Sequence, residues 1–275
     1  MKSACKIVIF SDLHYAPEIP VNNGSEIGRK LVEKSLPIFE NLLYKIKNEI
    51  KPDIVFNLGD VIEDFNDKEK DKQNYRFILN KLKQLNCPFY SATGNHDLRS
   101  MDSREELEEL MGYEHSTFSL DFNGYHFIVL GLELNNNQSN VFGGILKAHR
   151  VSEEDLIWLE NDLKHNKLPC IVFSHYSVAS DDMKGNYWFG RGNAERGVLG
   201  NSKEVKNILK KDKNLIAVFS GHQHWTKFHI EDGVNYYVIG SLSENINNNG
   251  IPDGVYFEVD LKDKNITIAE KRITI

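Results

Sequence analysis

The sequence of 275 residues has only three cysteines, no long apolar run and no excess of basic residues. Cys5, Cys87 and Cys170 are odd in number and lack metal-binding spacing, which argues against a disulfide framework. We expect the three cysteines to be reduced and to pack as small buried hydrophobic residues, as in a protein of a reducing compartment. No apolar stretch is long enough to span a bilayer, and the apolar run 7–10 is too short for the core of a signal peptide. These absences predict a cytoplasmic protein without a membrane segment.

The charge balance limits the choice of partners. Asp and Glu number 40 against 33 Lys and Arg, which gives a net charge of −7. A broad nucleic-acid surface needs a basic face, so we expect no nucleic-acid partner. A small anionic substrate stays compatible with this charge, because bound metal ions can supply local positive charge. Hydrophobic residues make up 40% of the chain, a share typical of a globular protein.

Strand and helix patterns alternate along most of the chain. Buried strands are predicted at 5–10, 53–56, 88–92, 170–173 and 215–219, and helices at 28–50, 75–85, 102–111, 152–163 and 202–209. Asn123-Gly124 predicts a hairpin, and the tail after residue 228 is typical of antiparallel strands. Loops are expected at 15–27, 133–145 and 176–201, the last long enough for a substrate lid. This order predicts a single α/β domain over residues 1–275, with mixed sheets covered by helices.

Side chains that can bind metal follow each of the five buried strands. They are Asp12, His14, Asp60, Asn95, His96, His175, His222 and His224. In open α/β sheets, ligands bind beyond the carboxyl ends of the strands. Residues i and i+2 of an extended segment point to the same side, so Asp12 with His14, and His222 with His224, could each present a pair of ligands.

Each of these motifs also has an ordinary structural explanation. A single histidine beside a strand is usually a hydrogen-bonded core residue, and Asp60 could cap a turn or helix. Five such motifs in register are difficult to explain separately, because unpaired buried charges cost several kcal/mol each. Bound cations remove this cost. Carboxylates, imidazoles and an amide oxygen suit divalent first-row metals, which favours a metal centre.

The complete set resembles the ordered motifs of the calcineurin-like metallophosphoesterases. The matching stretches are Asp12-Leu13-His14, Gly59-Asp60, Gly94-Asn95-His96-Asp97, His175 and Gly221-His222-Gln223-His224. The resemblance spans about residues 7–240. It implies a four-layer α/β/β/α sandwich of two mixed sheets flanked by helices, with two metals at the strand ends.

The resemblance also implies a role for each residue. The first metal would be held by Asp12, His14 and His224, and the second by Asn95, His175 and His222, with Asp60 bridging both. Asp60 and His96 would be the catalytic residues, His96 near the leaving group and not as a ligand.

The resemblance implies hydrolysis of phosphoesters by a metal-bridging hydroxide. We expect two divalent ions, Mn²⁺ in the first place, with Fe, Zn or Co as alternatives. The expected substrate is a small phosphodiester or nucleotide pyrophosphate. A phosphomonoesterase, a nuclease of the same family and a non-catalytic metal-binding scaffold stay as alternatives.

Further residues have two open explanations. Aromatic and arginine side chains of the loop 176–201 could stack on a base and pair with phosphate, or they could pack the loop onto the body, which we prefer. They are Tyr176, Tyr187, Trp188, Phe189, Arg191 and Arg196. Asp97 could orient neighbouring groups or cap a helix. His149 and Arg150 could also reach the site, but we prefer a surface role for them. The charged run 61–71 is expected to be a solvated loop and helix start. Ordinary structural roles are expected for His115, His126, His165 and His229.

Overall fold

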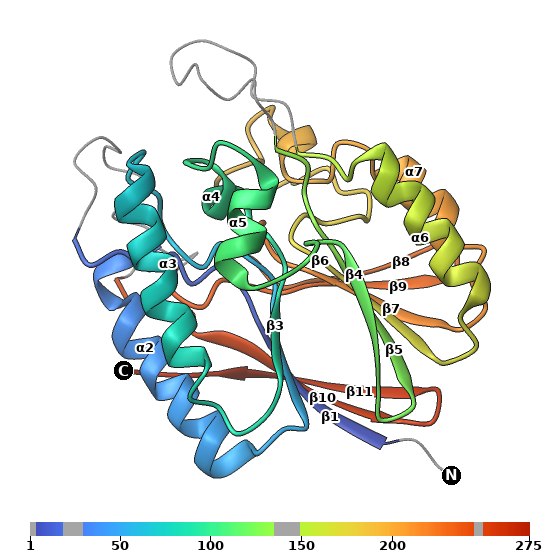
Figure 1. Cartoon of the computed structure of the whole chain (residues 1–275), viewed down its shortest axis with the longest axis horizontal. Helices are drawn as coiled ribbons and strands as arrows, with labels where there is room; N and C mark the ends of the chain where they lie inside the picture. The colour runs from blue at the N-terminus through green and yellow to red at the C-terminus, as the bar shows by residue number, and fades with distance from the viewer. Residues whose placement is uncertain (1–3, 19–29, 135–148, 245–249) are drawn as a thin grey trace.

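The computed structural model describes residues 4–18, 30–134, 149–244 and 250–275 (Figure 1). Most of the predicted loops 15–27 and 133–145, and the first two residues of the predicted helix 28–50, lie outside the described residues. The three cysteines are free thiols, with Cys5 and Cys170 buried. Among the described helices, none has both the length and the apolar character needed to cross a bilayer.

Two mixed sheets form the centre of the molecule (Figure 1). The first has the order β11-β10-β1-β2-β3. Its strands are β1 (Ala4–Phe10), β2 (Ile54–Asn57), β3 (Phe89–Ser91), β10 (Val255–Lys262) and β11 (Asn265–Arg272). β1, β2 and β3 run parallel, whereas β10 is antiparallel to both of its neighbours. The three parallel strands therefore end at one edge of the sheet.

The second sheet has the order β4-β5-β6-β7-β9-β8. Its strands are β4 (Phe118–Phe122), β5 (Tyr125–Leu130), β6 (Cys170–Ser174), β7 (Leu215–Ser220), β8 (Lys227–Glu231) and β9 (Val234–Val238). The predicted hairpin is β4–β5. The expected antiparallel tail is confirmed, because β8 pairs with β9 and β10 with β11 in antiparallel orientation. The tail joins the preceding strand β7 through β9, however, and that pair is parallel. After β7, the chain first forms the edge strand β8. It then turns back as β9, which lies between β8 and β7 and runs in the same direction as β7.

Helices cover the outer faces of both sheets (Figure 1). The helices of the first side are α2 (Val32–Lys45), its π-helical continuation η2 (Ile46–Ile50) and α3 (Lys68–Leu82), and those of the second side are α6 (Glu153–His165) and α7 (Ser202–Leu209). Two short helices, α4 (Asn95–Leu98) and α5 (Arg104–Met111), follow β3, and the 3₁₀ helix η4 (Ala194–Arg196) lies in the long loop. Helix α2 continues through Pro37. The four-layer α/β/β/α arrangement is confirmed.

Alternation along the strands explains why the two sheets pack together. Ile7 and Ile9 of β1 belong to the core between the sheets, whereas Val8 and Phe10 belong to the core beneath the helices. Between the sheets, the rings of Phe56 and Phe173 stack with centroids 3.9 Å apart. Strands buried on both faces require continuous apolar runs. This packing brings the carboxyl ends of the parallel strands of both sheets to one edge. That residues 1–275 form a single domain stays a prediction.

Candidate metal centre

The eight residues predicted from the strand ends come together at this edge. Asp12 and His14 follow β1, Asp60 follows β2, Asn95 and His96 begin α4, His175 follows β6, and His222 with His224 follows β7. All of them are buried except His96, which is partly exposed. The two sheets are linked here directly, because the His222 backbone N–H donates to Asp12 Oδ2 at 3.0 Å.

The backbone at this edge is left-handed at five non-glycine residues. They are Asp12, His14, Asp60, His222 and His224, with φ between 48° and 66°. The expectation that these pairs lie on extended segments was therefore wrong, although both members of each pair do reach the site. Non-glycine residues in this region cost about 1–3 kcal/mol each and persist only where the surroundings fix them. Here the N–H groups of Asp12 and His14 donate to the carbonyls of Gly59 and Asp60 at 3.1 and 3.0 Å.

Close backbone approach explains the glycine that precedes Asn95. A Cβ atom on Gly94 would lie 2.1 Å from Asp60 N and 2.2 Å from Asp60 Oδ1. Any side chain at this position would therefore push Asp60 out of place. The loops after β2 and β3 are in direct contact, and the His96 N–H donates to Asp60 Oδ1 at 2.8 Å.

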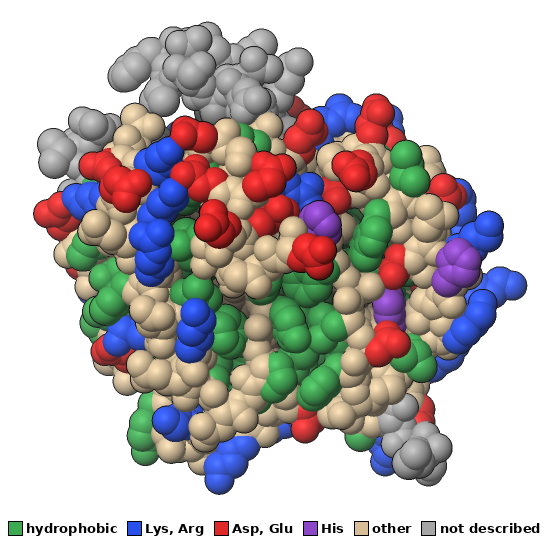
Figure 2. Space-filling view, viewed as in Figure 1, with side chains coloured by type: hydrophobic (Ala, Val, Ile, Leu, Met, Phe, Trp, Pro, Cys, Tyr) green, Lys and Arg blue, Asp and Glu red, His purple; other side chains and the backbone are tan. Residues whose placement is uncertain are grey.

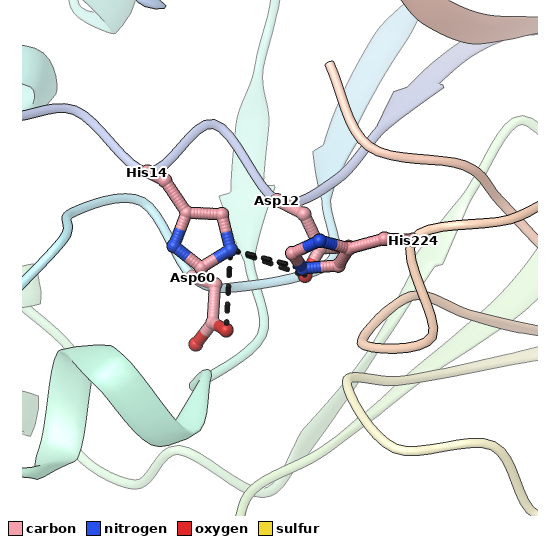
Figure 3. A group of neighbouring side chains, drawn as sticks. All are labelled: Asp12, His14, Asp60 and His224. Atoms are coloured by element: carbon pink, nitrogen blue, oxygen red, sulfur yellow. Dashed lines mark hydrogen bonds and ion pairs between the residues drawn. The ribbon is translucent and has the colours of Figure 1, made fainter. Parts of the chain in front are cut away.

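One group of side chains consists of Asp12, His14, Asp60 and His224, whose ligand atoms lie within 4.8 Å of one another (Figure 3). His14 Nε2 and His224 Nε2 face each other at 3.0 Å. His224 Nε2 lies 3.2 Å from Asp12 Oδ1, and His14 Nε2 lies 3.7 Å from Asp60 Oδ2. Two imidazole nitrogens and two carboxylates that converge in this way fit a divalent cation.

A second group consists of Asp60, His175 and His222, with Asn95 beside it. His175 Nε2 lies 3.4 Å from Asp60 Oδ2. The carbonyl oxygen of Asn95 faces His175 Nε2 at 3.2 Å and His222 Nδ1 at 3.0 Å. Hydrogen bonding alone would favour the opposite orientation, with the amide NH₂ toward the rings, whereas a cation between the three groups favours this one. Asp60 belongs to both groups, as a bridging carboxylate would.

The other nitrogen of each histidine also has a partner. In the first group these partners are carboxylates, because His14 Nδ1 lies 2.9 Å from Glu63 and His224 Nδ1 bonds to Glu244. In the second group they are backbone carbonyls. His175 Nδ1 bonds to Leu58 O at 2.8 Å, and His222 Nε2 bonds to Arg196 O at 3.0 Å. Such outer partners fix the orientation of a metal-binding ring.

Three buried carboxylates that contact the histidines of the site, Glu63, Asp64 and Glu244, were missed in the sequence. Glu63 and Asp64 lie in the charged run 61–71, which we expected to be solvated, yet both are almost fully buried. Their spacing of three and four residues from Asp60 was the signal that could have found them. Glu244 gave no local signal, because it lies far from every motif and reaches His224 only through the fold.

His96 stands beside both metal groups and has polar neighbours of its own. Its Nδ1 lies 2.6 Å from Asp64 Oδ2, which also accepts from Arg99 at 2.8 Å. Its Nε2 lies 3.1 Å from the ammonium of Lys30. The rings of His96 and His14 meet edge to face with centroids 4.9 Å apart. His96 is thus held in a fixed orientation next to the first group.

Asp97 combines the two roles that were left open. Its Oδ2 accepts the Gly94 N–H at 2.9 Å, which caps α4, and its Oδ1 accepts the Val61 N–H at 2.9 Å. It therefore ties the loop after β2 to the loop after β3. Burial, together with the charge of Asp60, raises the pKa of Asp97 to about 7.

Charges within the site set the protonation of the rings. Burial opposes a charged His224, but the carboxylates of Glu244 and Asp12 outweigh it and raise the pKa of His224 to about 10. Burial likewise opposes a charged His175, whose pKa Asp60 and Asp12 raise to about 9. Burial and the ammonium of Lys30 instead lower the pKa of His14 to about 4. A metal that binds His175 and His224 must therefore displace protons.

The loop 176–201 is anchored to the last pair of histidines. Besides the bond from His222 to Arg196 O, Asn186 Nδ2 donates to Gln223 O at 2.8 Å and Gln223 Nε2 donates to Gly197 O at 3.0 Å. Tyr176 stacks on the His222 ring with centroids 3.8 Å apart. The packing explanation therefore holds for Tyr176 and also for the buried Phe189.

The remaining histidine expectations have mixed outcomes. The surface role expected for His149 was wrong, because it is buried and its ring lies 5.7 Å from that of Tyr176. Arg150 is exposed, as expected. His126 has a structural role between Asp121 and Asp162, at 2.7 and 2.6 Å.

Comparisons with known proteins agree with this geometry. A family model described as calcineurin-like phosphoesterase matches residues 5–226. The chain is 25% identical over 227 residues to a probable glycerophosphodiester phosphodiesterase of Arcobacter nitrofigilis, and the matched region covers 79% of this chain and 71% of the relative. It is 23% identical over 227 residues to a probable cyclic nucleotide phosphodiesterase of Coxiella burnetii, and this match covers 82% of this chain and 78% of the relative.

A solved structure has a similar fold. A dimetal phosphatase from Danio rerio superposes with a TM-score of 0.73 at 14% identity and covers 99% of both chains.

Proposed function

Since the chain belongs to the calcineurin-like phosphoesterase family, and is thereby a metal-dependent phosphoric ester hydrolase, we propose that it cleaves phosphodiesters or nucleotide pyrophosphates of small nucleotide type. The observation that carries the proposal is the pair of side-chain groups that share Asp60. A carboxylate shared by both groups would hold two cations, which together would supply the charge stabilisation needed for displacement at phosphorus.

The proposed ligands follow from the two groups. Asp12, His14 and His224 would hold one metal, Asn95, His175 and His222 the other, and Asp60 both. The ligand atoms are oxygen and imidazole nitrogen, which accept Mn²⁺, our first choice, and also Fe, Zn or Co. When bound, two such ions acidify water and draw negative charge from the phosphoryl group.

His96 would act at the leaving-group end of the substrate. It is no member of the two groups that share Asp60, yet its ring touches that of His14. Asp64 lies 2.6 Å from Nδ1, and Nε2 faces the other way, toward the ammonium of Lys30. From there Nε2 can hydrogen-bond to the departing oxygen, a role typical of general acid catalysis.

Trp188, Tyr187 and Arg191 support a nucleotide-type substrate. Trp188 is only partly buried, and its ring lies 6.3 Å from that of His224. The guanidinium of Arg191 lies 5.7 Å from the ring of Tyr187, next to Trp188. Aromatic faces can stack on a base, and an arginine can pair with phosphate. The printed names of two relatives, one for cyclic nucleotides and one for glycerophosphodiesters, point to diesters as well.

A nuclease is less well supported. Figure 2 shows basic side chains in a short row over α3, with acidic side chains close by. On α3, Lys68 pairs with the carboxylate of Asp102, and Lys72 pairs with that of Glu106. Paired lysines and a net charge of −7 offer little attraction for a polyanion.

The test is a substrate screen of protein reconstituted with Mn²⁺. The panel holds cyclic mononucleotides, ADP-ribose, CDP-alcohols, glycerophosphodiesters, bis(4-nitrophenyl) phosphate and simple monoesters. We expect turnover of diesters or pyrophosphates, and Arg150→Gln serves as a control away from the ligands. Turnover of monoesters alone would refute the substrate class, and failure on the whole panel with both metals bound would favour the scaffold alternative.

A further inference from the structure

Lys30 reaches the metal centre although no sequence motif includes it. It lies just before α2, and its side chain is only 10% exposed. Its ammonium Nζ donates to Glu63 Oε2 at 2.7 Å and lies 3.1 Å from His96 Nε2. The same Nζ lies 5.8 Å from the ring of Trp188, at the rim of the site.

The ammonium occupies a place suited to a cation. His14, Glu63 and His96 form a third group of side chains of the kind that can hold a metal ion. Lys30 contacts two of these three residues, so the chain itself supplies positive charge there. A buried ion pair is weak support for stability, because apolar side chains of similar size often serve as well. Stability alone therefore gives no reason for a lysine here.

Lys30 also has a donor to spare. Nζ lies 3.1 Å from His96 Nε2, the ring nitrogen that faces away from Asp64, so Lys30 and this nitrogen are on the same side of the His96 ring. An ammonium carries three N–H donors. Among the described residues, Nζ donates a hydrogen bond to Glu63 and has one further polar contact, with His96 Nε2. The third N–H can face a ligand beside His96.

We propose that Lys30 is a catalytic residue that donates a hydrogen bond to the leaving-group oxygen of the phosphoester, beside His96. The inference rests on the proposed function and deepens it. In the reaction, water supplies the new P–O bond, and the bond from phosphorus to the leaving oxygen breaks. The electron pair stays on that oxygen, which takes up one proton of the water and leaves as a hydroxyl group, while the other proton of the water passes to the product phosphate or to solvent. Lys30 keeps its own protons and stabilises the charge that develops on the oxygen.

This role makes the effect of Lys30 depend on the leaving group. A nitrophenolate carries its charge well without help, whereas an alkoxide does not. The substrate class that needs Lys30 most is therefore the diester with an alkyl leaving group, such as a ribose hydroxyl in a cyclic nucleotide. Aryl diesters need it least.

The test compares Lys30→Met and Lys30→Arg with the parent protein, all loaded with Mn²⁺. The substrates are bis(4-nitrophenyl) phosphate, diphenyl phosphate and 3′,5′-cyclic AMP, in order of increasing basicity of the leaving oxygen. For Lys30→Met we expect a loss in kcat/KM of about 100-fold or more on the cyclic nucleotide, as for removal of one transition-state donor, and a loss of less than about 10-fold on the nitrophenyl diester. Lys30→Arg should fall between Met and the parent.

Two further measurements separate catalysis from structure. Metal content by elemental analysis and inhibition by inorganic phosphate should be the same in Lys30→Met and the parent. Lys34→Met is the matched control, because Lys34 lies four residues further along, in α2, and bonds to Gly250 O instead.

The outcomes distinguish this inference from the proposed function. A loss of the same factor on all three substrates, or a loss of metal, with an active parent protein overturns the role of Lys30 alone. A parent protein that holds both metals and cleaves none of the substrates overturns the proposed function and Lys30 with it.

Discussion

The two halves of the candidate metal centre are the group of Asp12, His14 and His224 and the group of Asn95, His175 and His222, which share Asp60. They differ in the hydrogen-bond partners of their histidines. In the first half, the ring nitrogens that face away from the site contact the carboxylates of Glu63 and Glu244. In the second half, they contact the backbone carbonyls of Leu58 and Arg196. A carboxylate partner raises the basicity of the ligating ring more than a neutral carbonyl does. We therefore expect the first half to bind its metal more tightly. Metal affinity in the first half should therefore depend on two carboxylate side chains, whereas in the second half it should depend on the position of two backbone carbonyls.

Removal of the shared carboxylate should have the largest effect, because it disturbs both halves at once. For Asp60→Asn we expect a loss of activity of about 10³-fold or more, since charge stabilisation by the metals is worth several kcal/mol. The second metal should no longer bind tightly, because Asp60 is the sole carboxylate of that group among the residues that the structure describes. Elemental analysis after dialysis checks this. A variant that retains two tightly bound metals would contradict the bridge.

His96 lies on the side of the first half, but we expect it to hold no metal. His96→Ala should therefore keep the full metal content and lose about 10²–10⁴-fold in turnover of substrates with poor leaving groups. Steady-state kinetics with an alkyl phosphodiester, together with a metal assay, measures both quantities. Unchanged kinetics on that substrate would reject the role at the leaving group.

Glu244→Gln tests the difference between the halves directly. The negative charge behind His224 disappears, so affinity for the first metal should fall about 10–100-fold. Affinity for the second metal should change little, because its histidines bond to carbonyls. Competition with a chelator of known affinity resolves the two binding steps. Glu231→Gln, at a carboxylate that bonds to Lys206, is the matched control. The asymmetry would be refuted if Glu244→Gln weakened the second metal more than the first.

His126 offers the same pairing of histidine and carboxylates away from the metal centre, where the effect should be smallest. Burial opposes its charge, but Asp162 and Asp121 outweigh it and raise the pKa of His126 above 6.5. A raised folded pKa stabilises the protein fully below the unfolded pKa, and this contribution is lost as the pH rises through the folded pKa.

His126→Gln should therefore cost about 1 kcal/mol in free energy of unfolding near pH 5.5, a typical value for a hydrogen bond, and less near pH 9. Urea denaturation of the metal-loaded proteins at both pH values gives the difference. A cost that is equal at the two values would show that the charge of His126 does not contribute.

Patterns in the sequence predicted mixed sheets covered by helices and the polar residues at the strand ends, because both depend on local order, whereas the four layers came from the family resemblance. Buried strands need continuous apolar runs, and the polar residues that follow them must lie at the sheet edge. The expected geometry of the pairs failed, since the alternation of an extended segment was assumed where the backbone of Asp12 and His14 is left-handed.

The outer partners could not be predicted for a different reason. Lys30 and Glu244 reach His96 and His224 only through the tertiary fold, from positions with no motif around them. Glu63 and Asp64 were hidden in a run whose composition is typical of solvated loops. Composition gives the average environment of a segment, and these two side chains depart from that average.

The bond between His222 and the carbonyl of Arg196 has a consequence for the loop 176–201. If the loop swings outward, it must release the ring that we expect to hold the second cation. Loading of that cation and closure of the loop should therefore favour each other, with the same coupling free energy in both directions. Cleavage of this segment by a protease should then slow down as manganese is added, even in the absence of any substrate.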